Sequence, residues 1–166
     1  AYGADTLRMW VSGVDYSGDV CVGTIIMKQV SEQYRKVRNT LRYLLGSLSD
    51  FNPATDAIVY ERLPAVDKYM LGVLSTVVGE VEAAYDGYQF YKANQAILKF
   101  VTNELSSFYV DVAKDRLYIS KQNELRRRSC QTVLQIVLEQ LAVLVAPIAP
   151  HLAEEVWQNL PYQKAT

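Results

Sequence analysis

One long apolar stripe limits what this chain can fold into. Between residues 24 and 48, apolar side chains recur at spacings of four and three residues, at Val30, Tyr34, Val37, Leu41, Leu44 and Leu48. These spacings return a side chain to the same side of an α-helix after each turn, whereas a strand would need alternation at every second residue. The stripe therefore predicts a helix of about seven turns that buries one face against other elements.

Helical periodicity continues along the rest of the chain. It predicts a short helix over about 3–14, long helices over about 64–86, 89–116 and 125–146, and a short last helix over about 150–160. Glycine, proline and polar residues predict loops or linkers over about 12–23, 49–65 and 119–124. Asp86-Gly87 and Pro147 are expected to end helices, and a kink is expected near Asn103. No segment alternates like a strand, so we expect an all-α antiparallel helical bundle, with about four long helices plus short terminal helices.

The composition is that of one globular domain without a recognisable catalytic centre. The chain has 166 residues, half of them hydrophobic and 21% charged, which is typical of a single core. Cys21 and Cys130 are the only cysteines and His151 is the only histidine, so we expect no metal site. Both thiols are expected to be reduced and at least partly buried. The sequence contains no evident acid–base pair, activated nucleophile, phosphate-binding loop or membrane-spanning run, so we predict no catalytic residues.

Positive charge gathers in two zones although the net charge is only −1. In the first zone, residues 28–42 hold five basic residues and one acid. Arg35, Arg38 and Arg42 each follow a stripe residue by one position, about 100° around a helix, so they form a second row beside the buried face. A cationic row on a rigid helix can hold a polyanion. The alternative is a solvated or salt-bridged helix face, and the charges alone leave both readings open.

The second zone covers residues 111–128, with six basic residues and three acids. Lys114 and Arg116 lie near a predicted helix C-terminus, where cations are favourable even without a ligand. Arg126, Arg127 and Arg128 lie near a predicted helix N-terminus, where positive charge is unfavourable. That position indicates either an anionic partner or carboxylates close by.

Five strings along the chain carry a resemblance to one enzyme family. YGADTLRMW (2–10) resembles the segment after the KMSKS loop of class I aminoacyl-tRNA synthetases, and DYSGD (15–19) resembles the turn that follows in the isoleucyl enzymes. YRKVRNTLRYLLG (34–46) and LSSFYVDVAKDRLY (105–118) are similar to two of their bundle helices, and the second string favours the isoleucyl type over the valyl and leucyl types. APIAPHLAEEVW (146–157) resembles the last helix that these enzymes share. The strings follow the family's order and span nearly the whole chain.

The resemblance implies the anticodon-binding helical bundle of a class I isoleucyl-tRNA synthetase, an enzyme that ligates isoleucine to its tRNA using ATP. It implies a segment connecting to the catalytic domain over 1–23 (short helix and loop), the bundle over 24–161 and a C-terminal tail over 162–166. The implied partners are tRNA(Ile), held through phosphate contacts with basic side chains, and the catalytic domain of the same polypeptide. The candidate tRNA-binding residues are Arg35, Arg38, Arg42, Lys114, Arg116, Arg126 and Arg127. A valyl- or leucyl-type bundle is the alternative within the family.

Motifs that the family uses elsewhere do not occur in this sequence. The HIGH and KMSKS signatures, an editing domain and a cysteine-rich zinc module are missing from it, so we expect no catalysis by the chain alone. ATP and zinc would then belong to other domains of the parent enzyme, which the resemblance implies to be a cytoplasmic or organellar monomer. A second hypothesis is a protein-docking module without RNA affinity. Leu7, Met9, Trp10 and Val11 would form an exposed apolar patch that docks on the catalytic domain.

Overall fold

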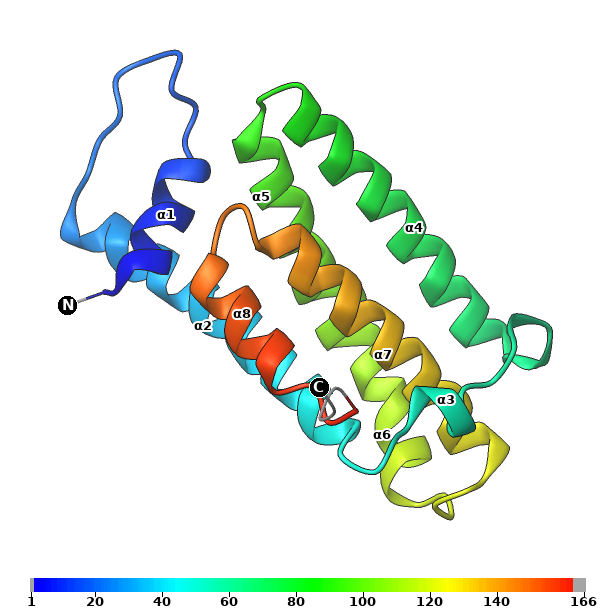
Figure 1. The fold of residues 1–166 in the computed structure, drawn as a ribbon. Coiled ribbons are helices and arrows are strands. Elements are labelled where there is room, and N and C mark those ends of the chain that lie inside the picture. The colour runs from blue at the N-terminus through cyan, green and yellow to red at the C-terminus, as the bar shows by residue number, and fades with distance from the viewer. Residues whose placement is uncertain (1, 163–166) are drawn as a thin grey trace.

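The computed structural model describes residues 2–162, and no strand forms in this range, which confirms the all-α prediction (Figure 1). The long helices lie side by side and alternate in direction along the bundle. The elements are α1 (Ala4–Ser12), α2 (Thr24–Ser47), α3 (Pro53–Asp56), the 3-10 helix η1 (Tyr60–Arg62), α4 (Ala65–Asp86), α5 (Phe90–Lys99), the π-helix η2 (Phe100–Tyr109), α6 (Val110–Tyr118), α7 (Leu125–Val145) and α8 (Pro150–Gln158). No helix in the described range is long and apolar enough to cross a membrane. Residues 163–166 of the predicted tail lie outside this range.

The central helix of the bundle is α7, because it is apolar on more than one side. Such a helix must be surrounded by protein, and α2, α4, α6 and α8 all pack against it. Its fully buried side chains include Val133, Leu134, Val137, Leu138 and Leu141. The helix ends two residues before the first proline of the turn that follows, and the second proline of that turn begins α8, where its missing N–H group would have had no partner.

The apolar stripe that predicts α2 is buried as expected. Val37, Leu41, Leu44 and Leu48 lie in the core, and α2 packs against α7, α8 and η2. The side of the helix next to this buried face is exposed at Arg35 and Arg42. The helix is therefore anchored along one face and presents its cationic row along another.

The third long helix contains a π-helical segment where the sequence predicts a kink. From α5 through η2 to α6, core residues recur at every fourth position, at Ala93, Ile97, Val101, Leu105, Tyr109, Ala113 and Leu117. In a regular α-helix each step of four residues would drift by about 40° around the axis. The wider turn of a π-helix takes up this drift. The segment therefore continues without a break, and the end of α6 still faces the core.

The turn between α4 and α5 differs from the prediction in one residue. The helix ends at the predicted Asp-Gly pair, but Gly87 has an ordinary φ of −82° whereas Tyr88 has a φ of 55°. The Gln89 N–H donates to the Ala84 carbonyl oxygen (2.7 Å), and the Tyr88 N–H donates to that of Tyr85 (3.0 Å). Tyr88 thus occupies the left-handed position of a Schellman motif, a conformation that costs a non-glycine residue about 1–2 kcal/mol.

A buried ion pair joins α4 and α6 to the start of α7. Arg116 of α6 is only 3% exposed; its Nη1 donates to Asp67 Oδ1 of α4 at 2.7 Å, and its Nη2 donates to Oδ2. The Tyr109 hydroxyl donates to the same Oδ1 (2.6 Å), and Arg116 Nη2 also donates to the Arg126 carbonyl oxygen (3.1 Å). Burial acts to lower the pKa of Arg116, but the hydrogen bonds to Asp67, together with the charges of Asp67 and other neighbouring groups, raise it overall. The guanidinium therefore stays charged inside the bundle.

We predict that Asp67→Ala destabilises the fold by about 3–5 kcal/mol, because it leaves the Arg116 guanidinium charged and unpaired in the core. Urea unfolding followed by circular dichroism measures this loss. Asp111→Ala is the control, since it removes only an exposed ion pair with Lys114 (2.9 Å) and should cost less than about 1 kcal/mol. Equal losses in the two variants would contradict a stabilising role for the buried pair.

Candidate nucleic-acid interface

Arg35, Arg38 and Arg42 form one row on α2, as the sequence predicts. Their spacings of three and four residues place them about one turn apart on the same side of the helix. Arg35 pairs with a glutamate one turn earlier on α2, and Arg38 Nη2 donates to Glu155 of α8 at 2.6 Å. No ion pair within residues 2–162 includes Arg42. Exposed pairs contribute little to stability, so Arg35 and Arg38 can exchange their partners for a phosphate, and Arg42 has none to give up.

The row lies on a ridge of α2 between two grooves. The α2–α6 groove encloses about 530 Å³ and is lined by Asn39, Arg42, Tyr43, Gly46, Ser47, Ser49, Leu117, Tyr118 and Arg127. The α2–α8 groove encloses about 470 Å³ and is lined by Arg38, Arg42, Leu45, Gly46, Leu152, Glu155, Val156 and Asn159. Both volumes lie within the range of pockets that bind small molecules. Arg42 borders both grooves.

Charge distinguishes the two grooves. Glu155 lines the α2–α8 groove and pairs with Arg38. Its negative charge still disfavours a phosphate in that groove. Every residue that lines the α2–α6 groove is neutral or basic, so a polyanion meets no repulsion from its walls. That groove also combines aromatic rings with amide and hydroxyl groups, which are the side chains that bind unstacked RNA bases. The α2–α6 groove is therefore the better candidate for a nucleic-acid site.

Two tyrosines from distant parts of the chain meet across the α2–α6 groove. The hydroxyl oxygens of Tyr43 and Tyr118 lie 3.5 Å apart. Burial raises the pKa of Tyr43 to about 12, so its hydroxyl stays protonated near neutral pH. Tyr118, the last residue of α6, is 71% exposed. Lys114 lies one turn before Tyr118 and pairs with Asp111 of the same helix, so it adds an exposed cation on that side of α6.

Arg116 and Arg127 form ion pairs with carboxylates of the bundle. The Arg116 guanidinium is buried against Asp67. It therefore stabilises the fold and is not exposed to contact tRNA, contrary to the prediction from the sequence. Arg127 borders the α2–α6 groove, but its Nη1 and Nη2 donate to the two carboxylate oxygens of Asp50 at 2.7 and 2.9 Å. We therefore leave both arginines out of the interface. Arg126 is exposed at the start of α7 and remains a candidate.

Carboxylates from the segment after α2 explain two of the arginines at the start of α7. The sequence predicts a plain linker over 49–65, but this segment forms α3 and η1 and brings Asp50 and Asp56 next to α7. Arg128 Nη1 lies 3.4 Å from Asp56 Oδ2 and donates to the Asp50 carbonyl oxygen at 2.9 Å. Hydrogen bonds from Arg127 lower the pKa of Asp50 to about 2. Neighbouring carboxylates, rather than a ligand, thus balance the charge of Arg127 and Arg128.

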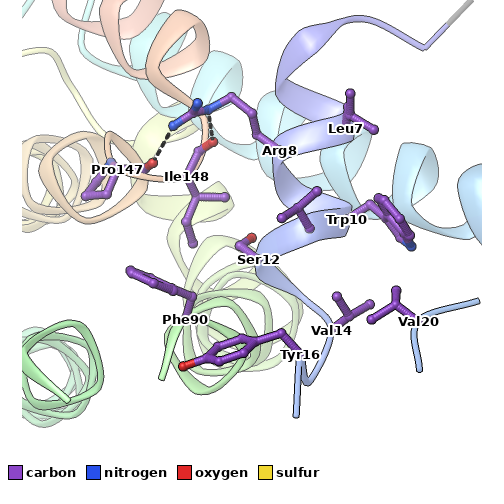
Figure 2. Close-up of a pocket in the computed structure, with 11 residues that line it drawn as sticks. Leu7, Arg8, Trp10, Ser12, Val14, Tyr16, Val20, Phe90, Pro147 and Ile148 are labelled. Atoms are coloured by element: carbon purple, nitrogen blue, oxygen red, sulfur yellow. Dashed lines mark hydrogen bonds between the residues drawn. The ribbon is translucent and has the colours of Figure 1, made fainter. Parts of the chain in front are cut away.

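A larger, apolar groove lies beside α1 at the other end of the bundle. It encloses about 740 Å³ and is bordered by α1, the loop that follows it and the turn between α7 and α8 (Figure 2). Leu7, Trp10 and Val11 line it, and both Leu7 and Val11 are more than half exposed, at 51% and 55%. The predicted apolar patch is thus present, except that Met9 points away from it and is buried in the core.

Polar contacts hold α1 against the turn between α7 and α8. Arg8 donates two hydrogen bonds of 2.9 Å to carbonyl oxygens of that turn (Figure 2). Asp5 is buried; its Oδ2 accepts the Leu152 N–H at 2.8 Å and its Oδ1 lies 2.7 Å from His151 Nδ1. Asp5 thereby satisfies one of the free N–H groups at the start of α8. These contacts fix α1 on the bundle and leave its apolar side facing outward.

The two thiols have different surroundings. Cys130 is buried, and burial raises its pKa to about 11, so it is a neutral part of the core. Cys21 is exposed in the loop before α2, which corrects the expectation that both thiols are at least partly buried. Within residues 2–162, no three histidine, cysteine or acidic side chains gather as a metal site would require.

Comparison with known proteins places the chain beside tRNA ligases. A family model described as anticodon-binding domain of tRNA ligase matches residues 67–166. The isoleucine–tRNA ligase of Cyanothece sp. is 56% identical over 161 residues, which cover 97% of this chain and 17% of that protein. The isoleucine–tRNA ligases of Synechococcus sp. (53% identical, 99% of this chain) and Thermosynechococcus vestitus (56% identical, 98% of this chain) also match over 17% of their length. The chain thus spans less than one fifth of these curated relatives.

We predict that the contribution of Asp50 to stability is complete above about pH 4 and is lost as the pH falls through about 2. The reason is that its pKa is lowered from 3.8 to about 2 in the folded protein, mainly by Arg127, so folding favours the ionised form. Unfolding free energies of the native protein and of Asp50→Asn at about pH 6, 4 and 2 measure this contribution. The variant should be less stable near pH 6, and the difference should shrink toward pH 2. A difference independent of pH would exclude the ion pair as its cause.

Proposed function

The chain belongs to the family of anticodon-binding domains of tRNA ligases, and we propose that it binds the anticodon stem and loop of tRNA(Ile) for an isoleucine–tRNA ligase. The observation that supports this most directly is the α2–α6 groove, which has no acidic lining residue and is bordered by Arg42, a residue without an ion pair within residues 2–162. The choice of isoleucine rests on the relatives, which are isoleucine–tRNA ligases.

We assign different RNA contacts to the basic side chains and to the aromatic and amide side chains. Arg35, Arg38 and Arg42 would contact phosphates along α2, which positions the RNA without reading its sequence. Lys114 and Arg126 would add phosphate contacts from α6 and α7. The α2–α6 groove would receive unpaired bases of the anticodon loop, because unstacked bases bind to aromatic rings and to amide groups.

The remaining chemistry of the ligase would lie in other parts of the parent enzyme. ATP-dependent ligation of isoleucine, and any zinc that the enzyme holds, would use residues outside this chain, which supplies binding and orientation. We propose that the parent acts as a monomer in the cytoplasm or in an organelle. In this arrangement the chain fixes the anticodon end of the tRNA while the acceptor end reaches the catalytic domain.

We predict that replacing Arg38 and Arg42 together by glutamine weakens binding to tRNA(Ile) and lowers the slope of log affinity against log salt by up to about 2, because each phosphate contact contributes about 0.9. Fluorescence anisotropy over a series of salt concentrations measures both quantities. The matched control replaces Lys92 and Lys99 of α5, which are exposed cations outside the proposed surface. Equal effects of the two double variants would place the RNA elsewhere. No binding of tRNA(Ile) by the native chain would reject the proposed function.

The apolar groove beside α1 supports a second role, docking on the catalytic domain. Exposed aliphatic side chains at Leu7 and Val11 border a groove of about 740 Å³, and contiguous apolar surface of this kind marks interaction sites. The relatives extend well beyond the matched region, so a longer polypeptide offers a surface to cover it. Docking through α1 and RNA binding at the C-terminal end of α2 use opposite ends of the bundle (Figure 1), so the two roles are compatible.

We predict that Leu7→Ser with Val11→Ser weakens binding of the chain, supplied in trans, to the Cyanothece ligase lacking the matching segment. Isothermal calorimetry measures this affinity. The stability of the chain should change by less than about 1 kcal/mol, because both side chains are largely exposed. Val59→Ser with Ile119→Ser is the control, since these residues are 60% and 78% exposed outside the groove. Unchanged binding by the Leu7 and Val11 variant would exclude docking through this groove.

A further inference from the structure

The geometry points to a binding site for one unstacked RNA base in the α2–α6 groove, stacked on Tyr118 with its phosphate on Arg42 and its edge read by Asn39. This inference deepens the proposed function and rests on it, because it names the residues that would distinguish one loop base from another. Its basis is the juxtaposition of three different chemical groups around a single opening of about 530 Å³.

Tyr118 is the stacking platform. Tyr118 is 71% exposed, and its hydroxyl lies 3.5 Å from that of Tyr43, so the tip of the side chain meets Tyr43 while most of its surface remains open. A fixed and open aromatic face is favourable for stacking, because little side-chain freedom is lost when a base binds. Tyr43 is half-buried and forms the neighbouring wall of the groove.

Arg42 supplies the cation for the phosphate of the same nucleotide. It borders the α2–α6 groove, is exposed, and takes part in no ion pair within residues 2–162. The other arginine of the lining, Arg127, is held by both oxygens of Asp50. A phosphate at the groove therefore binds Arg42 without having to displace a carboxylate.

Asn39 would read the edge of the base, and Gly46 leaves room for the base in the groove. Asn39 lies one turn before Tyr43 on α2, and its exposed amide offers both a donor and an acceptor to a base edge. Gly46 lies in the last turn of α2, and glycine is a weaker helix former than alanine. A Cβ at Gly46 would meet no atom within 4 Å, so packing does not require glycine there. Glycine instead keeps the ridge of α2 low where both grooves meet it.

The test uses hairpin RNAs with the sequence of the isoleucine anticodon stem and loop, in which one loop base at a time is replaced by the fluorescent base 2-aminopurine. We expect quenching for one loop position on binding to the native chain. Tyr118→Ala should weaken binding roughly 5- to 100-fold and abolish that quenching, whereas Tyr118→Phe should stay within about twofold. Arg42→Gln should weaken binding and lower the salt slope by about 1. Asn39→Ala should reduce the preference for the native base at that position.

Two further variants separate the binding site from the fold. Gly46→Leu should fill the groove and weaken binding while raising the thermal stability, because leucine is a better helix former than glycine. Tyr88→Ala is the matched control for Tyr118→Ala, since Tyr88 is 70% exposed in the turn between α4 and α5; it should bind like the native chain.

The outcomes distinguish this inference from the proposed function. If the native chain binds the hairpin but the Tyr118, Arg42 and Gly46 variants bind and quench equally well, the base site is wrong and the proposed function stands. If the native chain binds the hairpin no better than a duplex of the same stem without the loop, loop recognition fails and the base site fails with it.

Discussion

The buried pair between Asp67 and Arg116 holds together the end of the bundle on which the proposed interface lies. Arg116 connects α6 to α4 and, through the Arg126 carbonyl oxygen, to the first turn of α7. Taking both charges out of water is unfavourable unless hydrogen bonds complete the site, and Tyr109 supplies one of them. Tyr118 lies only two residues beyond Arg116, so the contact that stabilises the core also fixes the outer wall of the α2–α6 groove.

A single type of side chain serves two purposes in this protein, and burial separates them. Arg116 binds Asp67 inside the fold, where a lost partner would leave a charge in a medium of low polarity, and the partly buried Arg127 binds Asp50. Arg42 stands on the ridge of α2 with no such partner among the described residues. Arg116 and Arg127 therefore stabilise the fold, whereas Arg42 is available to an anion.

The helix α2 runs between two ends of the bundle that have different chemistry. Its start lies near α1 and the apolar groove, and its end borders the α2–α6 groove (Figure 1). The π-helical segment η2 contributes to this arrangement, since it keeps the face of α5 and the face of α6 on the same core. A rigid rod between an apolar docking surface and a cationic groove can orient a bound RNA relative to a protein partner.

Local sequence periodicity predicts the helical class, the buried stripe of α2, the positions of the main helices and the row at Arg35, Arg38 and Arg42. These features depend on local periodicity, because residues on one side of a helix are a few positions apart. The sequence also carries a signal for α3, because Asn52 caps the helix by accepting the Ala54 N–H and a proline follows it. Which of the described arginines lack a carboxylate partner depends instead on packing between distant parts of the chain. Asp67 lies 49 residues from Arg116, Asp50 lies 77 residues from Arg127, and Tyr43 lies 75 residues from Tyr118. Periodicity places a side chain on a face, but only the packing of distant helices selects the partner that it meets there.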